Sequence, residues 1–179
     1  ARTWAALILL LSDSLGRPKD ALALESAAKL ALVRSGDEPE LRATLLLNLA
    51  NAYQTAGRTD TAATYQLEAI ELREGEFGAD DHRVFDAKGN LANTRFAEGK
   101  FDEARRLHKE VLDHRIERLG PNHPDVAVSH NNLGNVYYTL DRLDDATHHL
   151  EAAVDIREQT LPKDHPRLLS TYTNLATAY

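Results

Sequence analysis

Apolar residues recur along the chain at the spacing of a buried helical stripe, and short polar turns interrupt them regularly. In the stretch HNNLGNVYYTL, residues 130–140, Leu133, Val136 and Tyr137 stand at i, i+3 and i+4. Turns such as GRTD, GKFD and DRLD and longer breaks such as LGPNHPDV separate similar stretches. The pattern predicts about nine helices and no strand, at approximately 3–14, 19–34, 39–55, 60–76, 81–97, 102–118, 123–139, 144–160 and 165–179.

The helical stretches repeat with a period of 42 residues. Several columns keep this register: Asn48, Asn90, Asn132 and Asn174; Leu49, Leu91, Leu133 and Leu175; the small residues Ala50, Ala92, Gly134 and Ala176; Ala62, Ala104 and Ala146; and Arg73, Arg115 and Arg157. A fainter first copy is offset by 41 residues, because its connection at 34–40 is one residue shorter. We therefore expect one array over 1–179, with repeats at about 1–38, 39–80, 81–122 and 123–164 and a half repeat at 165–179.

The period also predicts how the helices pair, turn and end. Small residues in two columns should let the two helices of a pair approach closely. Gly57, Gly99 and Asp141 stand where a left-handed residue ends the first helix, and Asp60, Asp102 and Asp144 stand near the start of the second, where an acidic cap suits the exposed N–H groups. His123 and His165 occupy equivalent connections and are expected to cap or pack there. The recurrent arginines indicate a structural pairing between repeats more than phosphate recognition.

These features resemble the tetratricopeptide repeat. The segments NLANAYQTAGR, NLANTRFAEGK and NNLGNVYYTLDR show leucine followed by a small residue, an aromatic four positions later and a glycine turn, with Arg95 and Asp141 as departures. The period and the connections GPNHPDVA and LPKDHPRL resemble the kinesin light chain type. The resemblance implies an all-α fold, a right-handed α-solenoid of antiparallel helix pairs, whose concave groove is lined by the first helix of each pair.

Projection onto those first helices places a set of mostly amide side chains in the expected groove. They are Asn48, Asn51, Gln54, Asp86, Asn90, Asn93, Phe96, Asn131, Asn132, Asn135, Tyr138 and Asn174. An amide offers donors and an acceptor, so we expect this row to bind the backbone of a peptide or protein segment. The alternative is that the amides tie adjacent helices together or hydrate the groove. Leu47, Gly89 and Thr139 offer no cation, which argues against a clamp for a partner's C-terminal carboxylate.

Composition narrows the classes of partner. The formal net charge is −7 and the pI is near 5.6, which argues against binding to nucleic acid or to a membrane surface. The longest apolar run, residues 4–11, is far shorter than the roughly 20 residues that span a bilayer. The chain has no cysteine, which fits a reducing compartment, and we expect a cytoplasmic location. We expect no metal site, because the adjacent His148 and His149 point about 100° apart on a helix.

Catalysis is not expected, because every polar feature recurs with the repeat whereas an enzyme needs one convergent site. No cofactor motif is present. Arginine outnumbers lysine, and we expect a region of a larger bacterial signalling protein whose other parts include a catalytic domain such as a kinase or ATPase. The first helix is apolar all round at residues 7–11, which predicts either a preceding helix in the parent chain or self-association. A structural spacer or self-association module with no external ligand is the alternative function.

Overall fold

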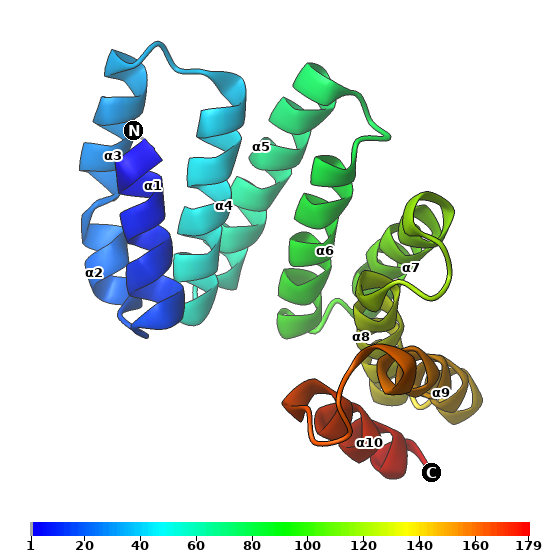
Figure 1. Ribbon diagram of the computed structural model, residues 1–179. Helices are drawn as coiled ribbons and strands as arrows, with labels where there is room; N and C mark the ends of the chain where they lie inside the picture. The colour runs from blue at the N-terminus through cyan, green and yellow to red at the C-terminus, as the bar shows by residue number, and fades with distance from the viewer. Residues whose placement is uncertain (1) are drawn as a thin grey trace. The chain divides into compact units, whose positions relative to one another are not determined.

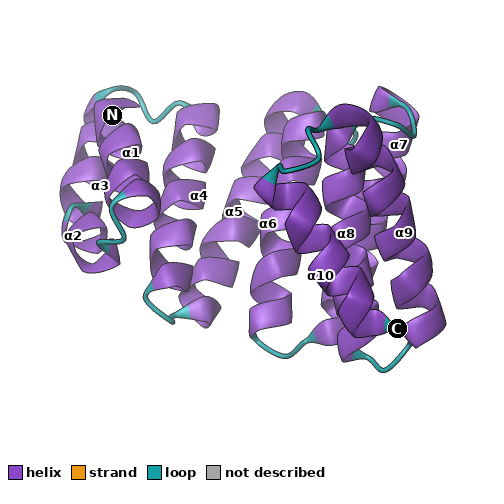
Figure 2. Cartoon of the chain, turned by 60° about the horizontal axis from the view of Figure 1, so that its bottom comes forward, coloured by secondary structure: helices purple, strands orange, loops and turns teal. Residues whose placement is uncertain are grey.

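The computed structural model of the chain describes residues 2–179, and every regular element in that range is a helix (Figures 1 and 2). Ala1, where the first predicted repeat begins, lies outside the described residues. The helices are α1 (Arg2–Leu9), the π-helical segment η1 (Leu10–Ser14), α2 (Pro18–Ala23), α3 (Glu25–Arg34), α4 (Pro39–Thr55), α5 (Thr59–Phe77), α6 (His82–Ala97), α7 (Phe101–Leu119), α8 (Pro124–Thr139), α9 (Leu143–Thr160) and α10 (Pro166–Ala178).

The all-α prediction is confirmed, and helices α4 to α10 begin and end close to the predicted positions. Residues 2–179 contain ten α-helices and one π-helical segment, close to the predicted number of about nine helices. The second predicted helix is divided at Leu24, whose N–H donates to the carbonyl of Ala21 at 3.1 Å in a tighter turn. The first predicted helix widens into η1, where the N–H of Leu15 reaches the carbonyl of Leu10 at 3.1 Å.

Helices α1 to α6 form one compact unit, residues 2–98, and helices α7 to α10 form a second, residues 99–179. The boundary falls between α6 and α7. In the first unit, Ile8, Ala28, Leu45 and Leu49 form a buried cluster that joins α1, α3 and α4. In the second unit, the buried residues of α7, α8, α9 and α10 share one cluster, which includes Leu112, Val126, Leu133, Leu150 and Ala178.

The small columns sit where the two helices of a pair approach most closely, as predicted. Ala50 and Ala62 are fully buried between α4 and α5. In the pair α8 and α9, Gly134 faces Leu150 so closely that an added Cβ would lie 2.6 Å from Leu150 Cγ. The stack therefore depends on residues without bulk at these positions.

The turns inside the pairs have the predicted left-handed residue. Gly57 has φ +78° and Asp141 has φ +57°, so the glycine column tolerates an aspartate, which visits this region more readily than most residues. The acidic residues Asp60 and Asp144 lie in the first turns of α5 and α9, but neither helix has a side-chain N-cap bond. They therefore act through the helix dipole rather than as the predicted caps.

The longer connections carry the side-chain caps. The Nδ1 atoms of His123 and His165 accept hydrogen bonds from the backbone N–H groups of Asp125 at 3.2 Å and Arg167 at 3.1 Å. Asp81 does the same for Arg83 at 2.9 Å. The capping role expected for both histidines is confirmed, and an aspartate serves the same purpose one repeat earlier.

The first helix shows a mixed surface. Ile8 is fully buried, whereas Leu7, Leu9 and Leu10 are exposed. The apolar face is therefore only partly used by α2, α3 and α4, and its partner stays a prediction. No helix in the described range is long and apolar enough to cross a membrane.

Candidate protein-binding face

The predicted contact residues all lie on α4, α6, α8 and α10, the first helices of the helix pairs, and none is fully buried. We call the surface that they form on each unit the first-helix face of that unit. In the first unit it comprises Asn48, Asn51, Gln54, Asp86, Asn90, Asn93 and Phe96; in the second it comprises Asn131, Asn132, Asn135, Tyr138 and Asn174. The apolar stripe of each helix turns the opposite side into the core, which explains why these polar residues tolerate their helical positions.

Some of the amides in the first unit hold helices together. The Nδ2 of Asn48 donates to the backbone carbonyl of Ala5 at 3.0 Å, which links α4 to α1. The Oε1 of Gln54 accepts a hydrogen bond from the buried hydroxyl of Thr94 at 3.3 Å, which links α4 to α6. The alternative interpretation, that amides tie adjacent helices, therefore describes these two residues.

The second unit repeats the same kind of link. The Nδ2 of Asn174 donates to the Oδ1 of Asn131 at 3.1 Å, which joins α10 to α8. This bond and the bond from Asn48 both connect residues 43 apart in the sequence. Asn48 and Asn174, two of the four residues of the asparagine column, thus each reach one repeat back to the preceding first helix.

The remaining amides make no such contact. Within residues 2–179, no hydrogen bond involves the side-chain amides of Asn51, Asn90, Asn93, Asn132 or Asn135. Each of these side chains is exposed or half-buried, so water satisfies it in the free protein. They are available to a ligand without breaking a bond of the fold.

Two aromatic side chains lie among the predicted contact residues. Tyr138 exposes 44% of its surface at the end of α8. Phe96 is half-buried on α6 and, like Asp86, takes part in further contacts of the chain. Tyr138 therefore supplies the largest exposed apolar area among the predicted residues.

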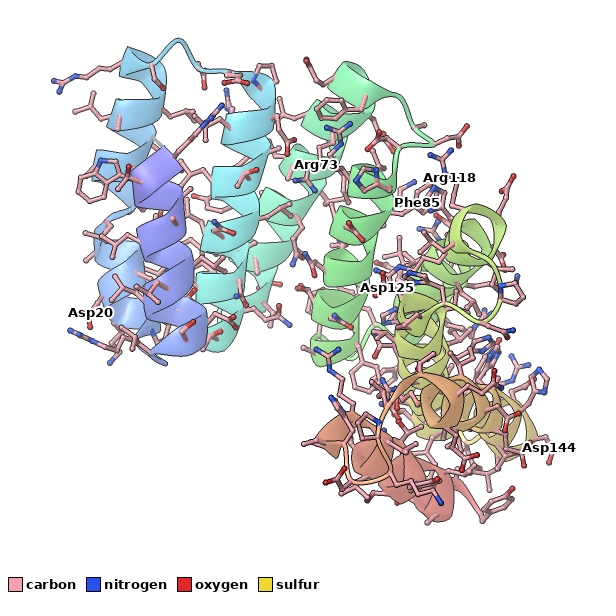
Figure 3. All side chains as sticks on the ribbon, viewed as in Figure 1. Asp20, Arg73, Phe85, Arg118, Asp125 and Asp144 are labelled. Carbon is pink, nitrogen blue, oxygen red and sulfur yellow. The ribbon has the colours of Figure 1, made fainter. Side chains whose placement is uncertain are left out.

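The recurrent arginines have the structural role that the sequence indicates. Each side chain donates through Nη1 to a backbone carbonyl ten residues later, in the first turn of the next helix: Arg73 to Arg83 at 2.8 Å, Arg115 to Asp125 at 3.3 Å and Arg157 to Arg167 at 2.8 Å. Figure 3 shows Arg73 on α5 and the neighbouring helix α6. Arg73 also bonds the carboxylate of Glu40 through Nε at 3.2 Å and Nη2 at 3.1 Å. These groups are occupied and offer no phosphate site.

A contact between two histidines was not predicted from the sequence. The Nδ1 atoms of His130 on α8 and His149 on α9 lie 2.9 Å apart, and the His149 ring stacks on Tyr137 with an interplanar angle of 4°. One imidazole must donate through Nδ1 and the other accept, so the accepting ring is neutral. Burial, aided by the neighbouring His130, lowers the pKa of His149 to about 4. The sequence does hold an indication of this contact, because both histidines lie within a few residues of the small columns that mark where α8 and α9 pack together.

A second unpredicted network joins α3, α4 and α5. The carboxylate of Glu25 accepts hydrogen bonds from the hydroxyls of Tyr53 and Tyr65, each at 2.5 Å, and pairs with the Nζ of Lys29 at 2.8 Å. Burial and the bond to Glu25 raise the pKa of Tyr53 to about 12. Burial alone would raise the pKa of Glu25, but its three donors lower it. The network is specific to the first repeat because Glu25 is not repeated.

The described residues contain no group of three or more side chains arranged to hold a metal ion. The Nδ1 atoms of His130 and His149 are hydrogen-bonded to each other.

Comparison with known proteins identifies the family. The sequence profile of the tetratricopeptide repeat matches residues 42–83, 83–159 and 125–179. The chain belongs to the tetratricopeptide repeat family. No curated protein matches it in sequence.

Solved tetratricopeptide repeat structures share its fold. BtubC (BKLC) from P. vanneervenii is 27% identical with a TM-score of 0.83, over 98% of this chain and 70% of that chain. A putative kinesin light chain with nearly identical TPR-like repeats from Podosopora anserina is 23% identical with a TM-score of 0.81, over 99% and 84%. The apo form of RapI is 18% identical with a TM-score of 0.83, over 99% and 62%. The α-solenoid class and its kinesin light chain-like repeat type are thereby confirmed.

Tetratricopeptide repeats generally bind protein partners and generally serve as non-catalytic scaffolds. This tetratricopeptide repeat chain is accordingly a protein-interaction scaffold in its general class.

Proposed function

We propose that the chain binds a peptide or protein segment at the first-helix faces of its units, and that the unbonded amides on α4 and α6 in the first unit and on α8 in the second make the contacts. The supporting observation is that Asn51, Asn90, Asn93, Asn132 and Asn135 make no hydrogen bond within the described residues and remain accessible. Each of these amides offers two donors and an acceptor to a peptide backbone without demanding a charged sequence. Asn48, Gln54, Asn131 and Asn174 support the face from the side, because their amides join helices.

The proposal extends to the setting of the chain. We propose that it is one region of a larger bacterial signalling protein that acts in the cytoplasm and that a separate part of that protein carries any catalysis. The excess of arginine over lysine and the absence of cysteine support this setting. The competing function is that of a purely structural spacer. The amides that join helices favour this function at their own positions.

The test separates the two kinds of amide. A phage-displayed library of random dodecapeptides is selected on the chain, and the affinities of the selected peptides are measured by fluorescence anisotropy. Asn90→Ala with Asn93→Ala in the first unit, and Asn132→Ala with Asn135→Ala in the second, should each weaken a peptide that uses that unit. We expect a loss of about threefold to tenfold for each amide that bonds the ligand.

The matched controls are Asn48→Ala and Asn174→Ala. They remove amides of the same column that already bond to the fold, so they should lower the thermal midpoint while the affinity of the folded protein changes less. A library that yields no specific peptide would refute the proposal and favour the spacer. So would peptides that bind equally well to the variant that combines Asn90→Ala, Asn93→Ala, Asn132→Ala and Asn135→Ala.

A further inference from the structure

A cavity lies between α3, α4 and α5, away from the first-helix face. Its volume is about 200 Å³. Leu32, Leu45 and Leu46, all buried, form its floor, and the charged side chains that line it are Lys29, Asp37, Arg42 and Glu68. Asn51 is nine residues from Arg42, which places it about half a turn around α4 on the opposite side of the helix.

The first repeat and the start of the second depart from the later copies at three positions that line the cavity. The later repeats bury large apolar residues at two of these positions and have the structural arginine at the third. Lys29 stands in the column of Ile70, Leu112 and Val154; Arg42 stands in the column of Val84, Val126 and Leu168; and Leu32 stands in the column of Arg73, Arg115 and Arg157. Charged and apolar residues have thus exchanged places.

The corresponding place in the second unit is filled. There Leu112 and Val126 belong to one buried cluster. Beside the cavity, Lys29 on α3 bonds Glu25 at 2.8 Å and Tyr65 at 2.9 Å, and Arg42 on α4 bonds Glu68 at 2.6 Å. Both side chains line the space over Leu32 and Leu45 without filling it. An unfilled apolar space forgoes packing energy, so stability alone does not account for the exchange.

The size of the cavity selects the ligand. A dry apolar cavity of about 150 Å³ is enough to bind benzene, whereas drug-sized ligands occupy about 300–1,000 Å³. A space of about 200 Å³ therefore suits one aromatic or branched aliphatic side chain. The leucine floor supplies the apolar contact that such an anchor needs.

The charged residues that line the cavity favour a particular charge on the partner, next to its apolar side chain. Two carboxylates, Asp37 and Glu68, share the single guanidinium of Arg42. Glu68 lies 2.6 Å from Arg42, but Asp37 lies 3.4 Å away and is the less committed partner. Asp37 is held at φ +50°, and its N–H bonds the carbonyl of Leu32 at 3.1 Å, so the backbone fixes its position beside the cavity.

We propose that this cavity is a second protein-binding site, which takes one large apolar side chain of a partner with a lysine or arginine beside it. The apolar side chain packs on Leu32, Leu45 and Leu46. The neighbouring cation pairs with Asp37, whose charge Arg42 neutralises only in part. The site is independent of the amides of the first-helix face.

The experiment uses two peptides that differ in one charge, Ac-Ala-Phe-Lys-Ala-NH2 and Ac-Ala-Phe-Glu-Ala-NH2, titrated into the full chain. The methyl signals of Leu32, Leu45 and Leu46 are followed by NMR. Both peptides should shift these methyls saturably, and the Phe-Lys peptide should bind about twofold to fivefold more tightly, the range of an exposed ion pair. Asp37→Asn should abolish that preference while it keeps the backbone, because asparagine also accepts a positive φ.

The matched control gives the three deviating positions the residues of their later copies. The triple variant Lys29→Ile, Leu32→Arg and Arg42→Val uses the chain's own later residues and should fill the cavity, so saturable shifts of Leu45 and Leu46 should disappear. Asn51→Ala should leave peptide binding at the cavity unchanged. Absence of saturable shifts in the wild-type chain, a preference for the Phe-Glu peptide, or undiminished binding to a folded triple variant would overturn the proposal. Asp37→Asn decides the charge preference even if the triple variant is unstable.

Discussion

Gly134→Ala should destabilise the α8–α9 pair, although alanine is normally the better helix residue. The exchange gains about 1 kcal/mol of helix propensity. Its new Cβ, however, would lie 2.6 Å from Leu150 Cγ and 3.0 Å from Leu150 Cδ2. Leu150 is 1% exposed and belongs to the cluster of Leu133 and Ala146, so it has no solvent into which to move. Overpacking of this kind costs about 1–3 kcal/mol. The net loss should therefore fall between zero and about 2 kcal/mol.

Gly75→Ala is the matched control. Gly75 lies inside α5 and is exposed, and an added Cβ meets nothing within 4 Å. This variant should gain about 0.5–1 kcal/mol, so the two exchanges should have opposite signs. Urea denaturation followed by circular dichroism measures both, and native-state hydrogen exchange of the α8 amides locates the loss.

A double-mutant cycle isolates the contact. Leu150→Ala removes the clashing atoms and by itself costs about 2–5 kcal/mol. In that background Gly134→Ala should become stabilising, with a coupling energy of about 1–3 kcal/mol between the two positions. If Gly134→Ala stabilises the wild-type chain as much as Gly75→Ala does, the argument from close helix approach is refuted.

Two further predictions concern histidines. The pKa of His149 is lowered to about 4 in the folded chain, against about 6.5 when unfolded, so stability should be complete above about pH 6.5 and fall as the pH drops towards about 4. His149→Gln should flatten this dependence of the thermal midpoint between pH 7.5 and 4.5 relative to wild type, and an unchanged slope would contradict the assignment. His123→Ala should cost about 1 kcal/mol in urea denaturation through the lost cap, whereas His123→Asp should cost little because Asp81 fills the same role; equal losses would show that the cap is unimportant.

The repeat pattern predicted most of the fold because the information is local and is repeated. A 42-residue period aligns each helix with its copies, so the bounds of α4 to α10 and the positive φ at Gly57 and Asp141 followed from pattern alone. The first repeat deviates from its copies. There the division at Leu24 and the π-helical turn after Leu9 were missed, because the period is fainter in this copy and no later copy carries either feature.

The sequence by itself determined which residues share a helix face, because 3.6 residues per turn fix that relation once the helix is known. It placed Asn48, Asn51 and Asn135 on one kind of surface. Only the tertiary structure decided that Asn48 bonds a carbonyl 43 residues away while Asn51 and Asn135 bond nothing within the described range. The choice depends on rotamers and on the distance to a neighbouring helix. Those are properties of packed pairs, which no single helix encodes.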